Sequence, residues 1–308
     1  MALREAGGPR SKSMQRPADI AGELAALTGL QCASAPARTV GGGSIHECYQ
    51  WPYEGGQLFV KVGPTAALAA FEAEAAGLAE LARAGALRVP RVYASGRTSQ
   101  DAFLALEWIE RGHADAACES RLGAGLAALH AVTAPRFGLA HDNLIGRTPQ
   151  ENTWGSDWAE FFRDRRLLPQ LARAAKQRLG RGLTVSGERL LQAVPGLLAG
   201  HAPAASLLHG DLWGGNWLCA AGGEPVVFDP SVYYGDRETD LAMTRLFGGF
   251  GAAFYQAYES VYPPAPGWRT RADLYNLYHL LNHANLFGGG YVQQAQALME
   301  RLLAHGGH

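Results

Sequence analysis

The sequence lacks the signatures of several large protein classes. Its 308 residues include four cysteines, Cys32, Cys48, Cys118 and Cys219, which form neither a CxxC pair nor a metal-ligand spacing. A disulfide framework and a structural zinc site are therefore not expected. We interpret the four cysteines as reduced thiols of a cytoplasmic protein.

Charge of one sign and long apolar runs are also missing. The chain carries 27 basic and 28 acidic residues, a net charge of −1, with no run of like charges. Proteins that bind nucleic acids or membrane surfaces concentrate positive charge, so neither partner is expected. No apolar run approaches the roughly 18 residues that span a bilayer, and the N-terminus has no apolar signal segment.

The composition is that of a globular protein. Hydrophobic residues make up 47% of the chain and charged residues 18%, which excludes a disordered tail and a coiled coil. A length of 308 residues exceeds a typical single domain and favours two lobes. Residues 1–17, rich in Arg, Gly, Ser and Pro, are predicted to be a disordered leader outside the fold.

Strand and turn signals dominate residues 18–108. The pattern predicts a short helix from Asp19 to Gly29 and a long helix at residues 65–83. Alternating apolar residues between turns predict five strands, which lie on either side of Gly41–Gly43 and at residues 57–62, 89–95 and 102–109. This first lobe is therefore expected to be a five-stranded antiparallel sheet with one long helix.

Residues 109–308 are mainly helical in pattern. Helical periodicity is found around residues 122–129, 158–179 and 274–303. Two short apolar runs lead into Asp211 and Asp229, which places both aspartates at strand ends or in the loops just beyond. The predicted fold is α+β, with two lobes and a mostly helical second lobe.

The strongest motif is His209-Gly-Asp-Leu-Trp-Gly-Gly-Asn216, followed by Asp229-Pro-Ser231. Phosphoryl transfer needs an oriented acceptor oxygen and a magnesium ion that neutralises phosphate charge. Asp211 can accept a hydroxyl proton, and Asn216 and Asp229 offer hard oxygen ligands to Mg²⁺. The bland alternative is an ordinary turn, because Gly, Asp and Asn favour turns. Nucleotide-binding features upstream favour the phosphoryl-transfer interpretation.

The first upstream feature is a glycine turn, Gly41, Gly42, Gly43 and Ser44, whose backbone amides could cover ATP phosphates. It is not the GxxxxGK pattern of a P-loop nucleotidase. Glycine-rich hairpin turns are common, so this turn counts only together with the features that follow it.

The second upstream feature is Lys61, on a predicted strand, where it could reach the α- and β-phosphates. Such a lysine needs an anionic partner, and either Glu72 or Glu74 of the next helix could supply one. We prefer Glu74 because it shares a helical face with Leu78 and Leu81. Taken alone, Lys61 would be interpreted as an ordinary solvent-facing charge.

The fifth strand ends at Glu107, Trp108 and Ile109, just before the helical half. A connection between lobes is where backbone contacts to adenine are expected, with ATP between the lobes. A connector packed by Trp108 is the plainer interpretation, and it is compatible with that role.

Together these residues resemble the fructosamine 3-kinase (ketosamine kinase) family, within the aminoglycoside phosphotransferase and protein-kinase-like group. The most specific motifs are GDLWGGN, DPSVYYGDRETDLA and FGGF. The resemblance extends over roughly residues 38–290. Further matching segments are residues 41–45, 59–62, 71–74, 136–138, 149–154 and 157–158.

The resemblance implies a kinase that uses ATP and Mg²⁺ to phosphorylate the 3-hydroxyl of a ketosamine, either free or attached to a protein lysine. Asp211 would be the catalytic base, Asn216 and Asp229 the magnesium ligands, and Lys61 with Glu74 the phosphate-orienting pair. Trp213 would line the sugar pocket, although it could instead anchor the catalytic loop. Either a monomer or a homodimer is compatible with the sequence.

Other residues of the matching segments have supporting roles by the same resemblance. Asp240 and Glu238 are expected to hold the catalytic and metal loops through hydrogen bonds, and His209 to pack behind the catalytic loop. Ser44 stands where some eukaryotic relatives have cysteine, so no thiol switch is expected there. Gly210 replaces the arginine of the protein-kinase HRD motif, and DFG and APE motifs are missing, so an activation loop is not expected.

Three alternative functions stay open. Within kinases, an aminoglycoside, choline or other small-alcohol phosphotransferase would use the same residues. A nucleotide-binding pseudokinase would keep the fold without turnover, but the presence of Lys61, Asp211, Asn216 and Asp229 disfavours it. A scaffold protein would require an apolar patch or a repeat, and the sequence shows neither.

Overall fold

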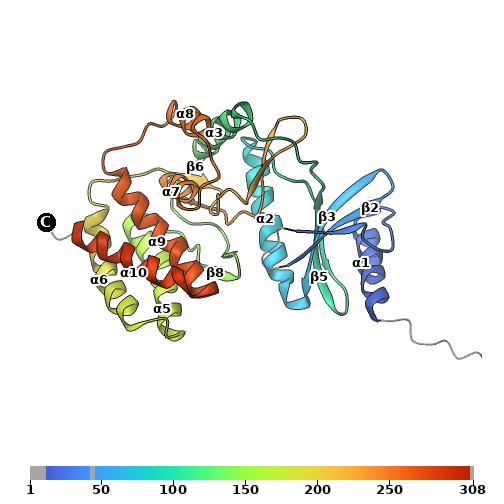
Figure 1. Ribbon diagram of the computed structural model, residues 1–308, viewed down its shortest axis with the longest axis horizontal. Coiled ribbons are helices and arrows are strands. Elements are labelled where there is room, and N and C mark those ends of the chain that lie inside the picture. Colours follow the sequence, from blue (N-terminus) through green and yellow to red (C-terminus); the bar gives the residue numbers. More distant parts are fainter. Residues whose placement is uncertain (1–11, 42–45, 306–308) are drawn as a thin grey trace, which may run out of the picture. The chain divides into compact units, whose positions relative to one another are not determined.

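The structure is a computed structural model that describes the backbone of residues 12–41 and 46–305 and the side chains from residue 16 onward (Figure 1). The chain divides into two compact units. The first unit comprises Met1–Ala76 and Pro90–Ile109, and the second comprises Gly77–Val89 and Glu110–His308. Within the described residues, no helix is both long and apolar enough to cross a membrane.

The first unit contains the predicted five-stranded antiparallel sheet, with strand order β1-β2-β3-β5-β4. Its strands are β1 (Arg38–Val40), β2 (Glu47–Tyr53), β3 (Gly56–Pro64), β4 (Val92–Arg97) and β5 (Asp101–Glu107). Alternate residues of β3, Leu58, Val60 and Val62, are buried in one core cluster with Ile20 and Leu24 of helix α1 (Lys12–Thr28). Figure 1 shows α1 beside the sheet.

Helix α1 begins earlier than the sequence predicts. It starts at Lys12 rather than at Asp19 and contains Pro17, so it takes in residues 12–17 of the segment that we predicted to be a disordered leader. Arg16 explains the difference, since it bonds Asp101 at 2.8–2.9 Å and Glu47 at 2.8 Å. These partners are distant in sequence, so local composition does not reveal them.

The long predicted helix is present as α2 (Leu68–Ala84), after a 3₁₀ turn at Thr65–Ala67. The apolar residues that predicted this helix form its buried face, since Phe71, Leu78 and Leu81 are all buried. The helix begins in the first unit and ends in the second.

The second unit is mostly helical, as predicted. Its helices are α3 (Ala116–His130), α4 (Trp158–Phe162), α5 (Leu168–Lys176), α6 (Arg181–Leu197), α7 (Glu238–Leu246), α8 (Ala252–Glu259), α9 (Trp268–Phe287) and α10 (Gly290–His305). A π-helical turn, Arg163–Leu167, joins α4 to α5.

Short antiparallel strands in the second unit support the loops. A three-stranded sheet has the order β12-β9-β6, and two hairpins pair β7 with β8 and β10 with β11. The strands are β6 (Thr133–Ala134), β7 (Asn143–Ile145), β8 (Thr148–Gln150), β9 (Ala205–Leu208), β10 (Trp217–Cys219), β11 (Pro225–Val227) and β12 (Tyr233–Gly235).

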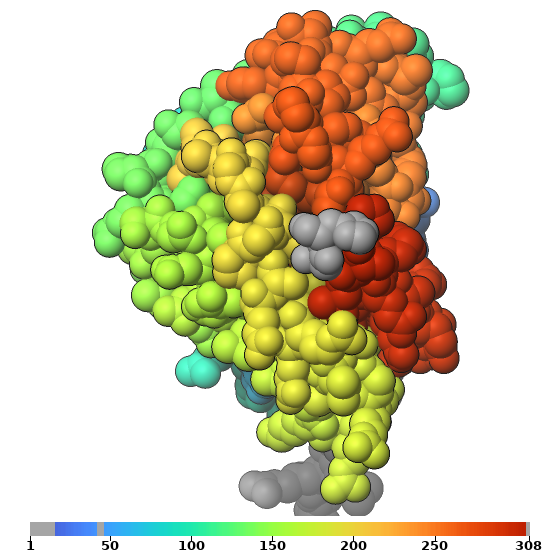
Figure 2. Space-filling model, turned by 90° about the vertical axis from the view of Figure 1, so that its left-hand side faces the viewer, coloured from blue at the N-terminus to red at the C-terminus, as the bar shows by residue number. Residues whose placement is uncertain are grey.

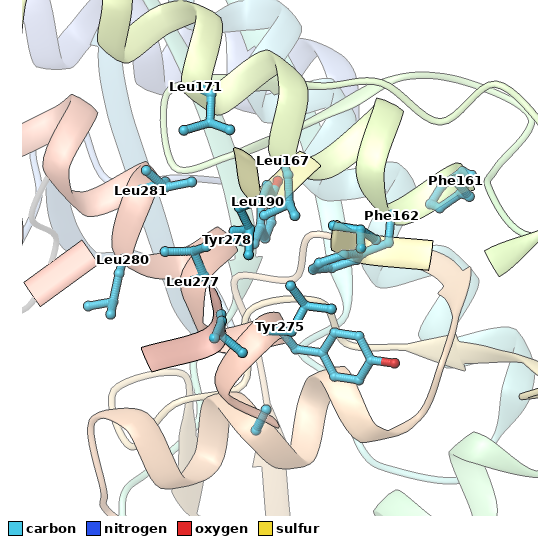
Figure 3. Close-up of a cluster of buried hydrophobic side chains, with 14 of the residues drawn as sticks. Phe161, Phe162, Leu167, Leu171, Leu190, Tyr275, Leu277, Tyr278, Leu280 and Leu281 are labelled. Carbon is cyan, nitrogen blue, oxygen red and sulfur yellow. The ribbon is translucent and has the colours of Figure 1, made fainter. Parts of the chain in front are cut away.

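Two apolar cores stabilise the second unit. The larger joins α4, α5, α6, α9 and α10, and Figure 3 shows Leu171, Leu190, Leu277 and Leu281 converging in it. Figure 2 shows α6 and α10, coloured yellow and red, side by side on the surface. The smaller core packs α3 against α8.

The contact between α3 and α8 is so close that it requires glycine at position 123. A Cβ atom at that position would overlap the backbone carbonyl oxygen of Phe254. We therefore expect Gly123→Ala to lower the free energy of unfolding by about 2 kcal/mol, because the two helices must move apart. Thermal unfolding of the purified variant measures this loss.

Gly196→Ala is the matched control for this prediction. Gly196 lies on the exposed side of α6 with nothing near its missing Cβ, so alanine there should stabilise the helix by up to about 1 kcal/mol. Equal melting temperatures for the two variants would contradict the predicted packing.

Candidate active site

The loop that contains the predicted base, residues 209–216, is named the catalytic loop after that prediction, and it begins where β9 ends, with a turn at Gly210. This residue has φ +84°, a conformation that L side chains rarely adopt, and a Cβ atom there would overlap the carbonyl oxygen of Ser231. The Ser231 N–H in turn donates to the His209 carbonyl at 2.9 Å. The segment around Asp211 therefore lies directly against the segment that follows Asp229.

The side chain of Asn216 brings the two aspartates together. Its Nδ2 donates to the backbone oxygen of Asp211 at 2.8 Å, to Asp211 Oδ2 at 3.1 Å and to the backbone oxygen of Asp229 at 3.5 Å. The β10–β11 hairpin fixes this arrangement, because Phe228 N–H donates to the Asn216 carbonyl at 3.0 Å. Three residues predicted from the sequence thus form one cluster.

The electrostatics of this cluster fit a bound divalent cation. Burial raises the pKa of Asp211 to about 7, and the nearby Asp229 carboxylate adds to this rise while Asn216 opposes it. A cation would relieve the repulsion between the carboxylates. The donor set is also suitable: Asn216 Oδ1 accepts no hydrogen bond from the described part of the chain, and carboxylate and amide oxygens suit Mg²⁺.

The side chain of Asp240, in α7, fixes the turn at Gly210. Its Oδ2 and Oδ1 atoms accept the backbone N–H groups of His209 and Gly210 at 2.8 and 2.9 Å. His130 Nε2 lies 3.1 Å from the same carboxylate, and His130 Nδ1 lies 2.7 Å from the Tyr258 hydroxyl. Burial alone would raise the pKa of Asp240, but the contacts with His130, His209 and the Gly210 N–H together outweigh burial and lower it. The expected loop-holding contact of Asp240 is confirmed.

Two further expectations about supporting residues have different outcomes. His209 is buried behind the loop, as predicted, with Nε2 3.0 Å from the Phe228 carbonyl, and burial lowers its pKa. The expectation for Glu238 is wrong, since its carboxylate forms a two-fold ion pair with Arg271 at 2.6 and 2.8 Å. Within the DRETDLA segment, it is therefore Asp240 whose side chain bonds the catalytic loop.

Trp213 lies on the surface of the catalytic loop, with 40% of its area exposed. Its ring lies over Gly215, where a Cβ atom would overlap the indole. The neighbouring Gly214 packs against Gly249, whose missing Cβ would lie 2.6 Å from the Gly214 Cα. Sequence reasoning missed this contact, although paired glycines in both the GDLWGGN and the FGGF motifs were the signal for it.

The first unit contains the predicted phosphate-orienting pair. Lys61 Nζ lies 2.8 and 2.9 Å from the two carboxylate oxygens of Glu74, while Glu72 is exposed. Lys61 is nearly buried, with 8% of its area exposed, so it is not the solvent-facing lysine of the plainer interpretation. The helical face of Glu74 therefore predicted the contact partner of Lys61 correctly.

The other residues predicted to bind nucleotide are placed in part. Gly41 follows β1, whereas Gly42, Gly43 and Ser44 lie outside the described residues. Glu107 ends β5, and its N–H donates to the Arg91 carbonyl at 2.8 Å. Trp108 precedes Ile109, and the centre of its ring lies 6.4 Å from that of Phe59. Trp108 therefore packs against the sheet, as the plainer interpretation expects.

This architecture occurs in kinase-like phosphotransferases. A crystal structure of the aminoglycoside phosphotransferase APH(4)-Ia superposes with a TM-score of 0.59 over 94% of this chain and 99% of that one. At 16% identity, that similarity shows a shared fold alone.

The family is more specific. The fructosamine kinase family model matches residues 17–305, so the chain belongs to the fructosamine kinase family. The chain is 44% identical to a Synechocystis protein named a probable ketoamine kinase, over 92% of this chain and 96% of that protein. It is 39% identical to the chloroplastic protein-ribulosamine 3-kinase of Arabidopsis thaliana, over 86% and 82% of the two chains.

A solved structure supports the same assignment. A Thermobifida fusca crystal structure assigned to the fructosamine-3-kinases has a TM-score of 0.81 and 35% identity, and the similarity covers 92% of this chain and 98% of that one. The family resemblance inferred from the sequence motifs is therefore confirmed.

The two hydrogen bonds to Asp240 generate a prediction about turnover. In Asp240→Asn, the amide group would face one of the two backbone N–H donors, so one bond is lost and the loop shifts. We expect kcat to fall by about 100-fold in a coupled ADP-release assay, a loss typical of a displaced catalytic group.

Glu238→Gln is the matched control, because it changes an adjacent buried carboxylate that contacts Arg271 instead of the loop. It should lower thermal stability while leaving kcat within about threefold of wild type. If Asp240→Asn keeps a wild-type kcat, the loop does not depend on this carboxylate.

Proposed function

We propose that this protein is an ATP-dependent kinase that phosphorylates the 3-hydroxyl of ketosamines of the fructosamine or ribulosamine type. The proposed acceptor is a ketosamine, either free or attached to a protein lysine. Membership of the fructosamine kinase family supports the reaction class, and the names of the relatives support the acceptor. The single observation that carries the proposal is the cluster of Asp211, Asn216 and Asp229 on two adjoining loops.

In this proposal, Asp211 is the general base. The acceptor oxygen attacks the γ-phosphorus of ATP, the bond to the β–γ bridging oxygen breaks, and ADP leaves. The hydroxyl proton passes to a carboxylate oxygen of Asp211, whose orientation Asn216 fixes. Mg²⁺, held by Asn216 and Asp229, would supply neutralisation of the phosphate charge.

Residues of the first unit are proposed to bind ATP. Lys61 would contact the α- and β-phosphates while Glu74 fixes its direction, and the glycine turn, residues 41–44, would cover the phosphates. Backbone groups of residues 107–109 would bind adenine. We also propose that the protein acts in the cytoplasm, as a monomer or a homodimer.

Trp213 is proposed to contact the sugar of the acceptor. It is the largest of the exposed hydrophobic side chains and stands two residues after Asp211. Because Gly215 has no Cβ atom, its backbone can lie against the indole, so one ring face is backed by protein. A sugar ring could stack on the other face.

The acceptor class is tested with a panel of substrates. Coupled ADP release should be fastest with fructosamines and ribulosamines and negligible with aminoglycosides and choline. Turnover of an aminoglycoside or choline without turnover of any ketosamine would replace the proposed substrate. Mg-ATP binding without transfer to any of these acceptors would favour a pseudokinase.

Replacing the proposed base tests the reaction. Asp211→Asn should lower kcat by about 100- to 10,000-fold, because the amide keeps the shape but accepts no proton. Its affinity for Mg-ATP, measured by calorimetry, should stay within a few fold of wild type. Turnover near the wild-type rate would rule out Asp211 as the base.

Replacing the exposed indole tests substrate contact. Trp213→Ala should raise KM for the ketosamine about tenfold, with ATP affinity and melting temperature unchanged, because the lost contact is made only to the acceptor. Trp213→Phe, which keeps a stacking face, should recover most of the affinity. A fall in melting temperature, with both substrate constants impaired together, would show that Trp213 anchors the loop instead.

A further inference from the structure

A buried polar network lies beneath the segment that follows Asp229. It is built from three amides, Asn143, Gln150 and Asn152, which we call the hairpin amides because they belong to the β7–β8 hairpin and its end. They are 8%, 1% and 0% exposed, respectively. The proposed reaction gives these residues no task, although two of them belong to a motif segment, residues 149–154. Buried amides need a structural or functional reason, because each must be fully hydrogen-bonded.

The hairpin amides bond the backbone just after Asp229. Asn143 Nδ2 donates to the Val232 carbonyl at 2.7 Å, and Gln150 Nε2 donates to the Ser231 carbonyl at 3.1 Å. In return, the Ser231 hydroxyl donates to the Leu144 carbonyl of β7 at 2.8 Å. These three bonds, two to backbone carbonyls and one from the Ser231 side chain, fix residues 231 and 232 to the hairpin.

Arg166 contacts the network at Asn152, the hairpin amide that makes no bond to residues 231 and 232. Its guanidinium is fully buried, donates from Nη2 to Asn152 Oδ1 at 2.8 Å and from Nη1 to the Glu151 carbonyl at 2.6 Å, and lies 3.9 Å from the centre of the Tyr233 ring. No described carboxylate forms an ion pair with it. A buried charge held by neutral acceptors and an aromatic ring is costly, so its position has a specific cause.

The chemistry of arginine sets the direction of the bonds that run from Arg166 through Asn152 to Asn143. Because a guanidinium can only donate, Asn152 must turn its oxygen toward Arg166 and its nitrogen toward Asn143 Oδ1, at 2.9 Å. Asn143 must then turn its own nitrogen toward the Val232 carbonyl. The Tyr278 hydroxyl orients Gln150 in the same way, by donating to its Oε1 at 2.7 Å.

The segment that these bonds hold is strained. Asp229 has φ +55°, in the left-handed region that costs a non-glycine residue about 1 kcal/mol or more. Such a conformation persists only when the flanking residues are fixed. The Ser231 carbonyl, which accepts from Gln150, also lies against Gly210 of the catalytic loop.

We propose that Arg166 and the hairpin amides are positioning residues that hold the metal-binding loop, residues 229–232, in the strained conformation that presents Asp229 to Mg²⁺. The inference deepens the proposed function, on which it rests, because that function makes Asp229 a metal ligand. It assigns a task to the PQENTW segment and to the buried arginine.

The test is a Mg²⁺ titration of nucleotide binding that needs no acceptor. Binding of the ATP analogue AMP-PNP to the full chain is measured by calorimetry at increasing Mg²⁺ concentrations. Asn143→Leu should raise the Mg²⁺ concentration for half-maximal binding about tenfold, as loss of a group supporting a metal ligand does. Excess Mg²⁺ should restore most of the binding.

Asn285→Leu is the matched control. Asn285 is as buried as Asn143, at 8% exposure, and the hydrogen bonds of its side-chain nitrogen go to Gln170 of α5, at 2.7 and 3.0 Å, and not to residues 229–232. Its loss should lower the melting temperature but leave the Mg²⁺ requirement within twofold of wild type. This pair separates loss of a buried amide in general from loss of support for Asp229.

Ser231→Ala keeps the test decisive if Asn143→Leu does not fold. It removes one hydrogen bond and little volume, and should raise the Mg²⁺ requirement about fivefold. An unchanged requirement in the variants that fold, or wild-type binding that does not depend on Mg²⁺, would overturn the inference. A wild type that phosphorylates no ketosamine refutes the proposed function alone, because the titration uses no acceptor.

Discussion

The carboxylate of Asp240 bonds the backbone N–H groups of His209 and Gly210, and the position of the catalytic loop depends on those two bonds. Backbone amides at a sharp turn need acceptors, and a buried carboxylate supplies two oxygens in one rigid group. The turn itself requires glycine, so the side chain that orients it must come from elsewhere. Helix α7 supplies that side chain, Asp240, and His130 of α3 contacts its carboxylate.

Two separate sets of contacts in the second unit therefore hold two adjoining loops. Asp240, supported by α3 and α8, holds the loop of Asp211, while the hairpin amides hold the loop of Asp229. Asn216 joins the loops at the point where their carboxylates come close. The helical cores supply rigidity, and the polar contacts supply direction, which a site for in-line transfer needs.

The local spacing of apolar residues predicted much of this fold. It could not predict contacts between residues that lie far apart in the sequence. The sheet strands and α2 follow from apolar spacing, as does the choice of Glu74 for Lys61. Helices α6, α7 and α8 were not predicted, since α6 contains Pro195 and the other two are short. Arg16 pairs with Asp101, and His130 with Asp240, across 85 and 110 residues, which no local window contains.

In the proposed reaction, the 3-hydroxyl of a ketosamine receives the phosphoryl group while Asp211 takes its proton. Phosphorus–proton correlation NMR of the product formed from ATP and a fructosamine tests this most directly, because it locates the phosphate on one carbon. We expect a single product with phosphate on O3, formed together with one ADP and missing when Asp211→Asn replaces the wild type. Phosphate on another oxygen, or an equal yield from Asp211→Asn, would contradict it.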